Sequence, residues 1–158
     1  MTRSFNALIL SLLLAACHRP DFTESVTPVA ATSLTLVSQA RAESSYVDIT
    51  LGGGTPASIG SFTGEVVHEG EWTFVACDAQ QPQALLACKE HGSTLRIAAA
   101  WAGGTHAGAL VRLTYVKRTA TAVPRFTFAV SEAHGARGAS LLDSLEVRRT
   151  SVMSGGDH

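Results

Sequence analysis

From Ser33 to near the C-terminus, the chain alternates apolar and polar residues with a period of two. In the segment SYVDITLGG, Val47, Ile49 and Leu51 fall on one side and the residues between them fall on the other. Alternation over four to eight residues between glycine-rich or polar turns is typical of strands with one buried face. The same pattern recurs in SLTLVSQA, GSFTGEVVHEG, EWTFVACDA, PRFTFAVSEA and DSLEVRRTSV. The sequence therefore predicts a chain built from short strands.

One stretch, TLRIAAAWAGGTHAGALVRLTY at residues 94–115, is rich enough in alanine to suggest a helix. A helix would carry Gly103, Gly104 and Gly108 in its interior, where each glycine costs about 1 kcal/mol relative to alanine. Two strands around a glycine-rich loop carry no such cost, and apolar residues alternate on both sides of the loop. We therefore predict a strand pair, with the two strands on either side of the glycine-rich loop.

The predicted strands number eight or nine, and QQPQALLACKE is the one candidate for a helical turn. Many short strands with glycine-rich turns are typical of an all-β sandwich or barrel. No shift in composition divides residues 33–152, so we expect one domain there, followed by a disordered tail at 153–158. The charge is nearly balanced, with 12 Lys and Arg against 13 Asp and Glu, which argues against nucleic-acid binding.

The N-terminus has the form of a secretory signal, because Arg3 precedes an apolar run at 7–14 that is shorter than the roughly 20 residues of a membrane-spanning helix. Cys17 ends the run LLLAAC, which resembles the lipobox of bacterial lipoproteins. The resemblance implies a signal peptide at 1–16 and acylation of Cys17; the alternative is an ordinary signal peptide. His18 stands where an aspartate would favour inner-membrane retention, which implies an outer-membrane or cell-surface location. Residues 17–32 lack periodicity and predict a lipid-anchored tether of roughly 50 Å when extended.

Cys77 and Cys88 are the cysteines that remain once Cys17 is acylated, and disulfides persist in the oxidising compartment that a secreted chain enters. A bridge between them would close a loop of about a dozen residues and contribute on the order of 3 kcal/mol. The alternatives are two buried thiols or half a metal site, but neither residue has a CxxC partner or a histidine at metal-ligand spacing. We predict a disulfide.

The order of these strands resembles that of cohesin-type domains and their relatives among carbohydrate-binding-domain-like sandwiches. The matching segments are a GxxLRIA strand at Gly92–Ala98, a GxLxxLxY strand at Gly108–Tyr115, and an FxFxxxEA strand at Phe126–Ala133. The resemblance covers about Ser33–Val152. It departs from the family in FTGEVVHEG, which lacks a Tyr-Asp ending, and in CDAQQPQALLAC, where the family has a longer excursion. It implies a jelly-roll β-sandwich and a protein-binding role, since cohesins bind calcium-loaded helical dockerins on one sheet face; it transfers no functional residue.

Catalytic motifs are missing from the sequence, which has no GxSxG elbow, HExxH or Walker loop. The carboxylates are too dispersed to propose a glycosidase pair, and no calcium-loop motif is present, although loop carbonyls could hold a structural calcium ion. His68 and the other histidines outside the tether and tail stand at predicted strand ends or loops, where exposure to solvent is ordinary. Asp78, Glu90 and His91 form the one polar cluster near the predicted disulfide. We expect no catalysis, no metal and no cofactor.

A non-catalytic binding or scaffolding module of the cell envelope is the function that these observations favour. Its partners would be membrane lipid through Cys17 and a dockerin-like protein that meets a sheet face or an exposed edge strand. A polysaccharide-binding module is an alternative and would need exposed coplanar rings; Trp72 and Trp101 are the candidate ligand-face residues, with Tyr46 and Tyr115 as further rings. A structural subunit of an envelope assembly is the third hypothesis and would need a large exposed apolar patch.

Overall fold

The computed structural model describes residues 31–41, 44–53, 58–119 and 125–153. Residues 151–153 are described by their backbone alone. Within these ranges the chain forms nine strands and one short 3-10 helix. The elements are β1 (Thr32–Ala40), β2 (Ser44–Gly52), β3 (Ile59–Glu69), β4 (Trp72–Ala79), β5 (Ala84–His91), β6 (Thr94–Trp101), β7 (Gly108–Lys117), β8 (Arg125–Gly135), η1 (Leu142–Ser144) and β9 (Leu145–Met153). The prediction of an all-β chain of eight or nine strands is confirmed.

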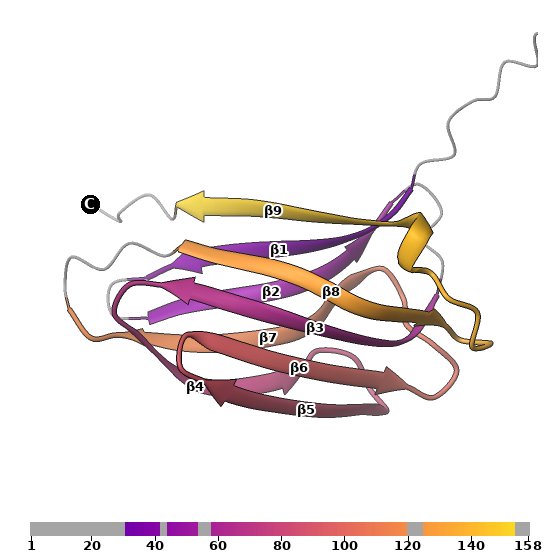
Figure 1. The fold of residues 1–158 in the computed structure, drawn as a ribbon, viewed down its shortest axis with the longest axis horizontal. Coiled ribbons are helices and arrows are strands. Elements are labelled where there is room, and N and C mark those ends of the chain that lie inside the picture. Colours follow the sequence, from indigo (N-terminus) through magenta and orange to yellow (C-terminus); the bar gives the residue numbers. More distant parts are fainter. Residues whose placement is uncertain (1–30, 42–43, 54–57, 120–124, 154–158) are drawn as a thin grey trace, which may run out of the picture.

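The strands lie in two sheets that pack face to face (Figure 1). One sheet has the order β4-β7-β2-β1-β9 and the other the order β5-β6-β3-β8. β1 and β9 run parallel, and the other paired neighbours run antiparallel. Consecutive strands such as β3 and β4 therefore fall in different sheets, as in a jelly-roll sandwich.

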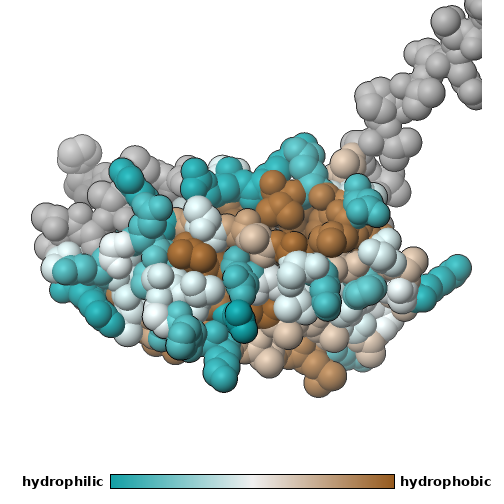
Figure 2. Space-filling model, viewed as in Figure 1, coloured by the Kyte–Doolittle hydropathy of each residue, from teal (hydrophilic) through white to brown (hydrophobic). Residues whose placement is uncertain are grey.

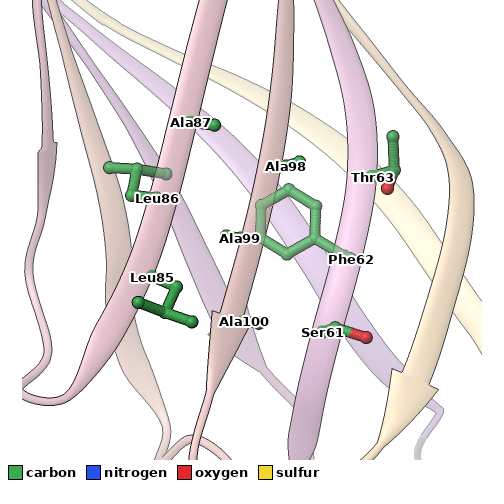
Figure 3. A pocket seen from close by; sticks show the side chains of 9 residues that line it. All are labelled: Ser61, Phe62, Thr63, Leu85, Leu86, Ala87, Ala98, Ala99 and Ala100. Carbon is green, nitrogen blue, oxygen red and sulfur yellow. The ribbon is translucent and has the colours of Figure 1, made fainter.

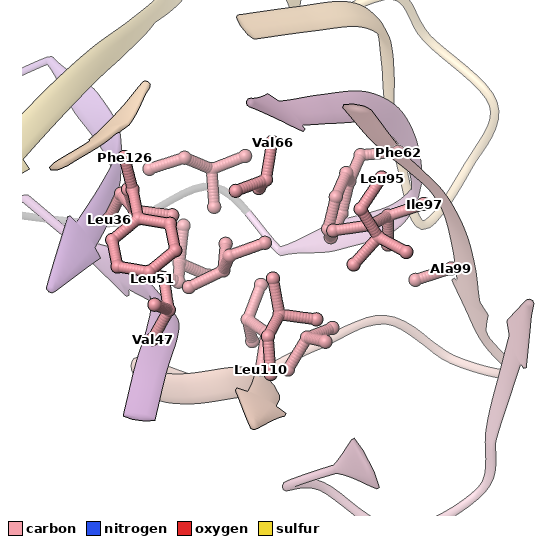
Figure 4. Close-up of a cluster of buried hydrophobic side chains, with 14 of the residues drawn as sticks. Leu36, Val47, Leu51, Phe62, Val66, Leu95, Ile97, Ala99, Leu110 and Phe126 are labelled. Atoms are coloured by element: carbon pink, nitrogen blue, oxygen red, sulfur yellow. The ribbon is translucent and has the colours of Figure 1, made fainter. Parts of the chain in front are cut away.

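The core lies between the sheets and is filled by the apolar side of each strand (Figure 4). Burying one large aliphatic side chain contributes roughly 1.5–3 kcal/mol, so the alternating residues supply the main drive to stack the sheets. The fully buried side chains include Leu34, Leu36, Val47, Ile49, Phe62, Leu95, Ile97, Leu113 and Tyr115.

The alanine-rich stretch at 94–115 forms two strands, β6 and β7, as predicted. The predicted pairing of the two strands with each other is wrong, because β6 belongs to the four-stranded sheet and β7 to the five-stranded sheet. The loop between them therefore crosses from one layer to the other. Gly103 and Gly104 take φ angles of +85° and +87° in this loop, a conformation that glycine adopts without steric cost.

The predicted helical turn within QQPQALLACKE is wrong, because residues 84–91 form β5. Alanine, leucine and glutamine favour helices only weakly, and the hydrogen bonds that β5 makes along β6 outweigh that preference. Leu86 and Cys88 pack against the core while Leu85 points to solvent, which is the alternation of an edge strand.

The described domain begins with β1 at Thr32 and ends with β9 at Met153, one residue beyond each predicted boundary. The predicted signal peptide, Cys17 and nearly all of the tether fall outside the described residues, as does the tail from 154 on. Among the residues that are described, no helix has the length and apolar character required to span a membrane.

A candidate binding face

The outer side of the four-stranded sheet carries the residues that alternate with the core positions of β5, β6 and β3. Strand pairing arranges them in rows that run across the three strands. The rows are Leu85–Ala100–Ser61, Ala87–Ala98–Thr63, Lys89–Arg96–Glu65 and His91–Thr94–Val67. The first two rows are uncharged and mostly small, whereas the third is charged across all three strands.

The two uncharged rows enclose an open hollow of about 400 Å³ (Figure 3). Its small side chains are those of Ser61, Thr63, Ala87, Ala98 and Ala100. Leu85 stands at its edge and is 78% exposed. Small residues leave room for another backbone to approach the sheet closely, and an exposed leucine gains by burial. We call this feature the small-residue hollow.

A second hollow of about 420 Å³ lies beside the first and is lined by Glu65, Lys89, His91, Thr94 and Arg96. Arg96 Nε donates a hydrogen bond of 2.8 Å to Glu65 Oε1 across β6 and β3. We call this feature the charged hollow. Figure 2, which looks onto this sheet, shows teal side chains over the middle of the face, tan and brown ones toward its lower right, and a larger brown group toward its upper right.

The outer face of the five-stranded sheet differs, because its central charges are already paired. Arg112 donates hydrogen bonds of 2.7 and 2.8 Å to the two carboxylate oxygens of Asp48. The guanidinium carbons of Arg41 and Arg112 stand 4.9 and 5.6 Å from the centre of the Tyr46 ring. This arrangement engages the Tyr46 ring within the chain.

Trp72 and Trp101 do not form a ligand face, because their exposed fractions are only 2% and 5%. Trp72 packs against Phe126 with ring centres 6.0 Å apart, and Trp101 stacks on Phe62 at 6.0 Å. Each tryptophan lies in phase with the core positions of its strand, and burying such large rings contributes more than exposing them to solvent. Tyr115 is also fully buried.

The structure brings Cys77 and Cys88 together in a disulfide. Cys77 lies in β4 and Cys88 in β5, which are edge strands of opposite sheets. The bridge therefore joins the two layers along one side of the sandwich, and Cys88 directly precedes Lys89 on β5.

Asp78, Glu90 and His91 do not form a cluster. Asp78 continues from Cys77 toward the β4–β5 turn, whereas Glu90 and His91 lie beyond Cys88 in the opposite direction. Asp78 is paired in register with Arg112, and His91 lines the charged hollow. Within the described part of the chain, no three His, Cys, Asp or Glu side chains gather into a group that could hold a metal ion.

His68 is buried, contrary to the expectation of a solvent-exposed histidine at a strand end. It is 7% exposed, and its Nε2 lies 4.0 Å from Glu90 Oε1. Burial lowers the pKa of His68, although the charge of Glu90 opposes the shift. Burial likewise raises the pKa of the Tyr115 phenol, whose ring centre is 5.5 Å from that of His68. The signal for burial was in the sequence, because His68 is in phase with Phe62 and Val66 along β3.

No protein-family model and no curated protein sequence matches this chain. Its fold is that of cohesin modules, because solved structures of such modules are similar to this chain over most of its length. A non-cellulosomal cohesin from Archaeoglobus fulgidus is 11% identical, with a TM-score of 0.55, over 80% of this chain and 91% of that one. The sixth cohesin of Acetivibrio cellulolyticus scaffoldin B, in complex with the Cel5 dockerin, is 12% identical, with a TM-score of 0.60, over 80% and 99%. A type I cohesin–dockerin complex from Clostridium thermocellum contains a chain 10% identical, with a TM-score of 0.57, over 77% and 99%.

Proposed function

We propose that this protein is a non-catalytic, cohesin-like binding module of the cell envelope that docks a dockerin-like helical protein on the outer face of the β5-β6-β3-β8 sheet. The observation that carries the proposal is the small-residue hollow beside a charged hollow on that face. Structures of the same fold that hold dockerins support a protein as the partner.

The physical argument rests on what a helix needs from a flat sheet. Alanine and serine side chains at Ala87, Ala98, Ala100 and Ser61 keep the surface low, so that a helix can bring its side chains into contact with the sheet. Leu85 supplies an apolar contact at the border of the hollow, and burial of its exposed side chain by a partner would add to the affinity. The charges at Lys89, Arg96 and Glu65 form a polar rim, which sets orientation more than affinity.

A binding role needs no cofactor in this chain, and we propose that it has none. The polar residues that an enzyme would need close together are divided between β4, which carries Asp78, and β5, which carries Glu90 and His91 beyond the disulfide in the opposite direction. Glu65 is the one carboxylate among the described residues that line the two hollows, and Thr94, which lies opposite His91 in register, makes no side-chain hydrogen bond to it.

For its location we propose a lipid anchor at Cys17, with the tether up to residue 32 holding the sandwich clear of the outer membrane or cell surface. The LLLAAC sequence supports this proposal. Incorporation of labelled palmitate into the full-length protein, and loss of the label in Cys17→Ser, tests it. Equal labelling of the two proteins would contradict it.

The docking face is tested with a panel of calcium-loaded dockerin modules and with the envelope proteins of the source cell, using the full-length protein as bait. We expect a dockerin-like protein to bind with an affinity that Ala98→Arg lowers at least about tenfold, which corresponds to roughly 1.4 kcal/mol. Ala98 is exposed in the small-residue hollow, so an arginine there blocks the face without entering the core. Val116→Arg is the matched control, because Val116 is 38% exposed on the other sheet.

Three outcomes would overturn the proposal. If the captured dockerin-like protein bound Ala98→Arg as tightly as the unchanged protein, the docking face would be wrong. If the protein bound polysaccharide columns and no member of the panel, the polysaccharide-binding alternative would replace it. Recovery of the protein only within a fixed envelope complex would favour the structural-subunit alternative.

A further inference from the structure

The charged row of the binding face places two positive charges side by side. Lys89 and Arg96 are directly opposite each other on β5 and β6, and like charges in such positions destabilise a strand pair. Arg96 is compensated on its other side by Glu65, whose carboxylate accepts its hydrogen bond at 2.8 Å. Within the part of the chain that the structure describes, Lys89 has no ion pair or hydrogen bond through its ammonium group.

Lys89 is therefore a position on this face where an added negative charge would be stabilising. β5 is the edge strand of its sheet, so no further strand covers Lys89 on its open side. A partner's carboxylate on the open side of Lys89 would complete a row of four charged groups across the face. The order would be the partner's carboxylate, Lys89, Arg96 and Glu65. His91, two residues along β5, lies on the same side of the hollow and adds a second donor.

The separation of Lys89 from the small-residue hollow sets the spacing that a partner must match. The centre of that hollow lies between the rows of Leu85 and Ala87, three residues back along β5. At about 3.3 Å per residue in a strand, the separation is roughly 10 Å. An α-helix rises about 1.5 Å per residue and returns to nearly the same face after seven residues, which is about 10.5 Å.

We propose that the partner helix lies along β5 and β6 and carries an apolar side chain for the small-residue hollow and an acidic side chain seven residues away that pairs with Lys89. This inference rests on the proposed function and specifies the chemistry of its partner. It concerns one ion pair at the rim of the interface, whereas the proposed function concerns the hollow itself.

The test uses two 15-residue alanine-rich helical peptides as probes, each with leucine at position 4 and with either glutamate or glutamine at position 11. Binding to the isotope-labelled full-length protein is followed by the shifts of its backbone amide signals in NMR titrations. We expect the glutamate peptide to bind about threefold to fivefold more tightly, the range expected of one exposed ion pair. In Lys89→Gln the two peptides should bind equally, and in Lys89→Glu the glutamine peptide should bind better. A third peptide, with its glutamate moved to position 13 on the opposite side of the helix, should bind like the glutamine peptide.

The outcomes separate this inference from the proposed function. If both peptides bind equally to the unchanged protein and Ala98→Arg abolishes both, the acidic contact is wrong and the docking face stands. If neither peptide binds, the inference is also overturned, while the capture of dockerin-like proteins decides the proposed function separately. A preference for glutamate that survives in Lys89→Gln would assign the contact to another residue and overturn the inference as well.

Discussion

We expect loss of the Cys77–Cys88 disulfide to destabilise the sandwich by about 3 kcal/mol, because the bridge closes a loop across a sequence separation of 11 residues. In the chain-entropy model, this is the free energy that the crosslink removes from the unfolded ensemble. The topology gives a second reason to expect destabilisation of the folded state when the bridge is lost, because the bridge joins two edge strands. β4 and β5 are edge strands of opposite sheets, so each has a hydrogen-bonded neighbour on one side alone.

The assay is urea unfolding followed by tryptophan fluorescence. The chain has two tryptophans, and both are buried in the core, so their emission should shift when the sheets separate. The protein is compared in its oxidised and reduced forms and as the double variant Cys77→Ser/Cys88→Ser. In thermal unfolding, the same loss of about 3 kcal/mol would lower the Tm by roughly 10–15 °C for a domain of this size.

The reduced protein is the more direct comparison, because it keeps both sulfur atoms where they pack against the core. The double variant should be at least as destabilised, since it also replaces two partly buried sulfurs. If reduction lowered the free energy of unfolding by less than about 1 kcal/mol, the loop-closure reasoning would be refuted. If the double variant were much less stable than the reduced protein, packing by the sulfurs would be the dominant effect.

Two further predictions concern buried positions. Burial lowers the pKa of His68 in the folded state. As the pH falls, the imidazole therefore takes up its proton in the unfolded chain before it does so in the folded chain. The contribution of His68 to stability is complete above about pH 6.5 and falls as the pH decreases below that value. Urea unfolding between pH 7.5 and 5.5 should show this loss, and His68→Leu should reduce it; an unchanged pH dependence would refute the assignment. Gly60→Ala should destabilise the domain by about 1–3 kcal/mol, because the new Cβ would lie 2.7 Å from the Gly135 carbonyl oxygen on β8. Gly52→Ala, whose Cβ would come no nearer than 3.4 Å to its neighbours, is the control, and equal effects of the two substitutions would contradict the close approach of β3 and β8.

The strand content and the two-sided character of each strand could be predicted from the sequence, because in an extended chain successive side chains point to opposite faces. Leu95, Ile97 and Ala99 are buried and Arg96 and Ala98 are exposed, as their alternation predicts. The same reasoning predicts His68 as buried, since it continues the inward phase of β3. The opposite expectation followed from its polarity and its position near the strand end.

Which strands pair, and therefore which outward residues become neighbours, was decided by the tertiary structure. β6 and β7 follow each other in the chain and lie in different sheets, while β3, central to the four-stranded sheet, is brought beside β6 and β8. The tryptophans show the same limit, because an aromatic residue on a strand can face a partner or the core, and only the packing against Phe62 and Phe126 decides.

The binding face illustrates the difference in physical terms. Alternation along a strand is local and is set by backbone geometry, so Arg96 and Glu65 can each be assigned to an outward position from the sequence alone, whereas Lys89 lies in the segment predicted to form a helical turn. Their row depends on the register of β5 against β6 and of β6 against β3, and residues 65 and 96 are 31 positions apart. Register between distant strands depends on how the whole core packs, because a slip of one residue would turn a strand's apolar side to solvent. The uncompensated charge at Lys89 is therefore a property of the folded chain.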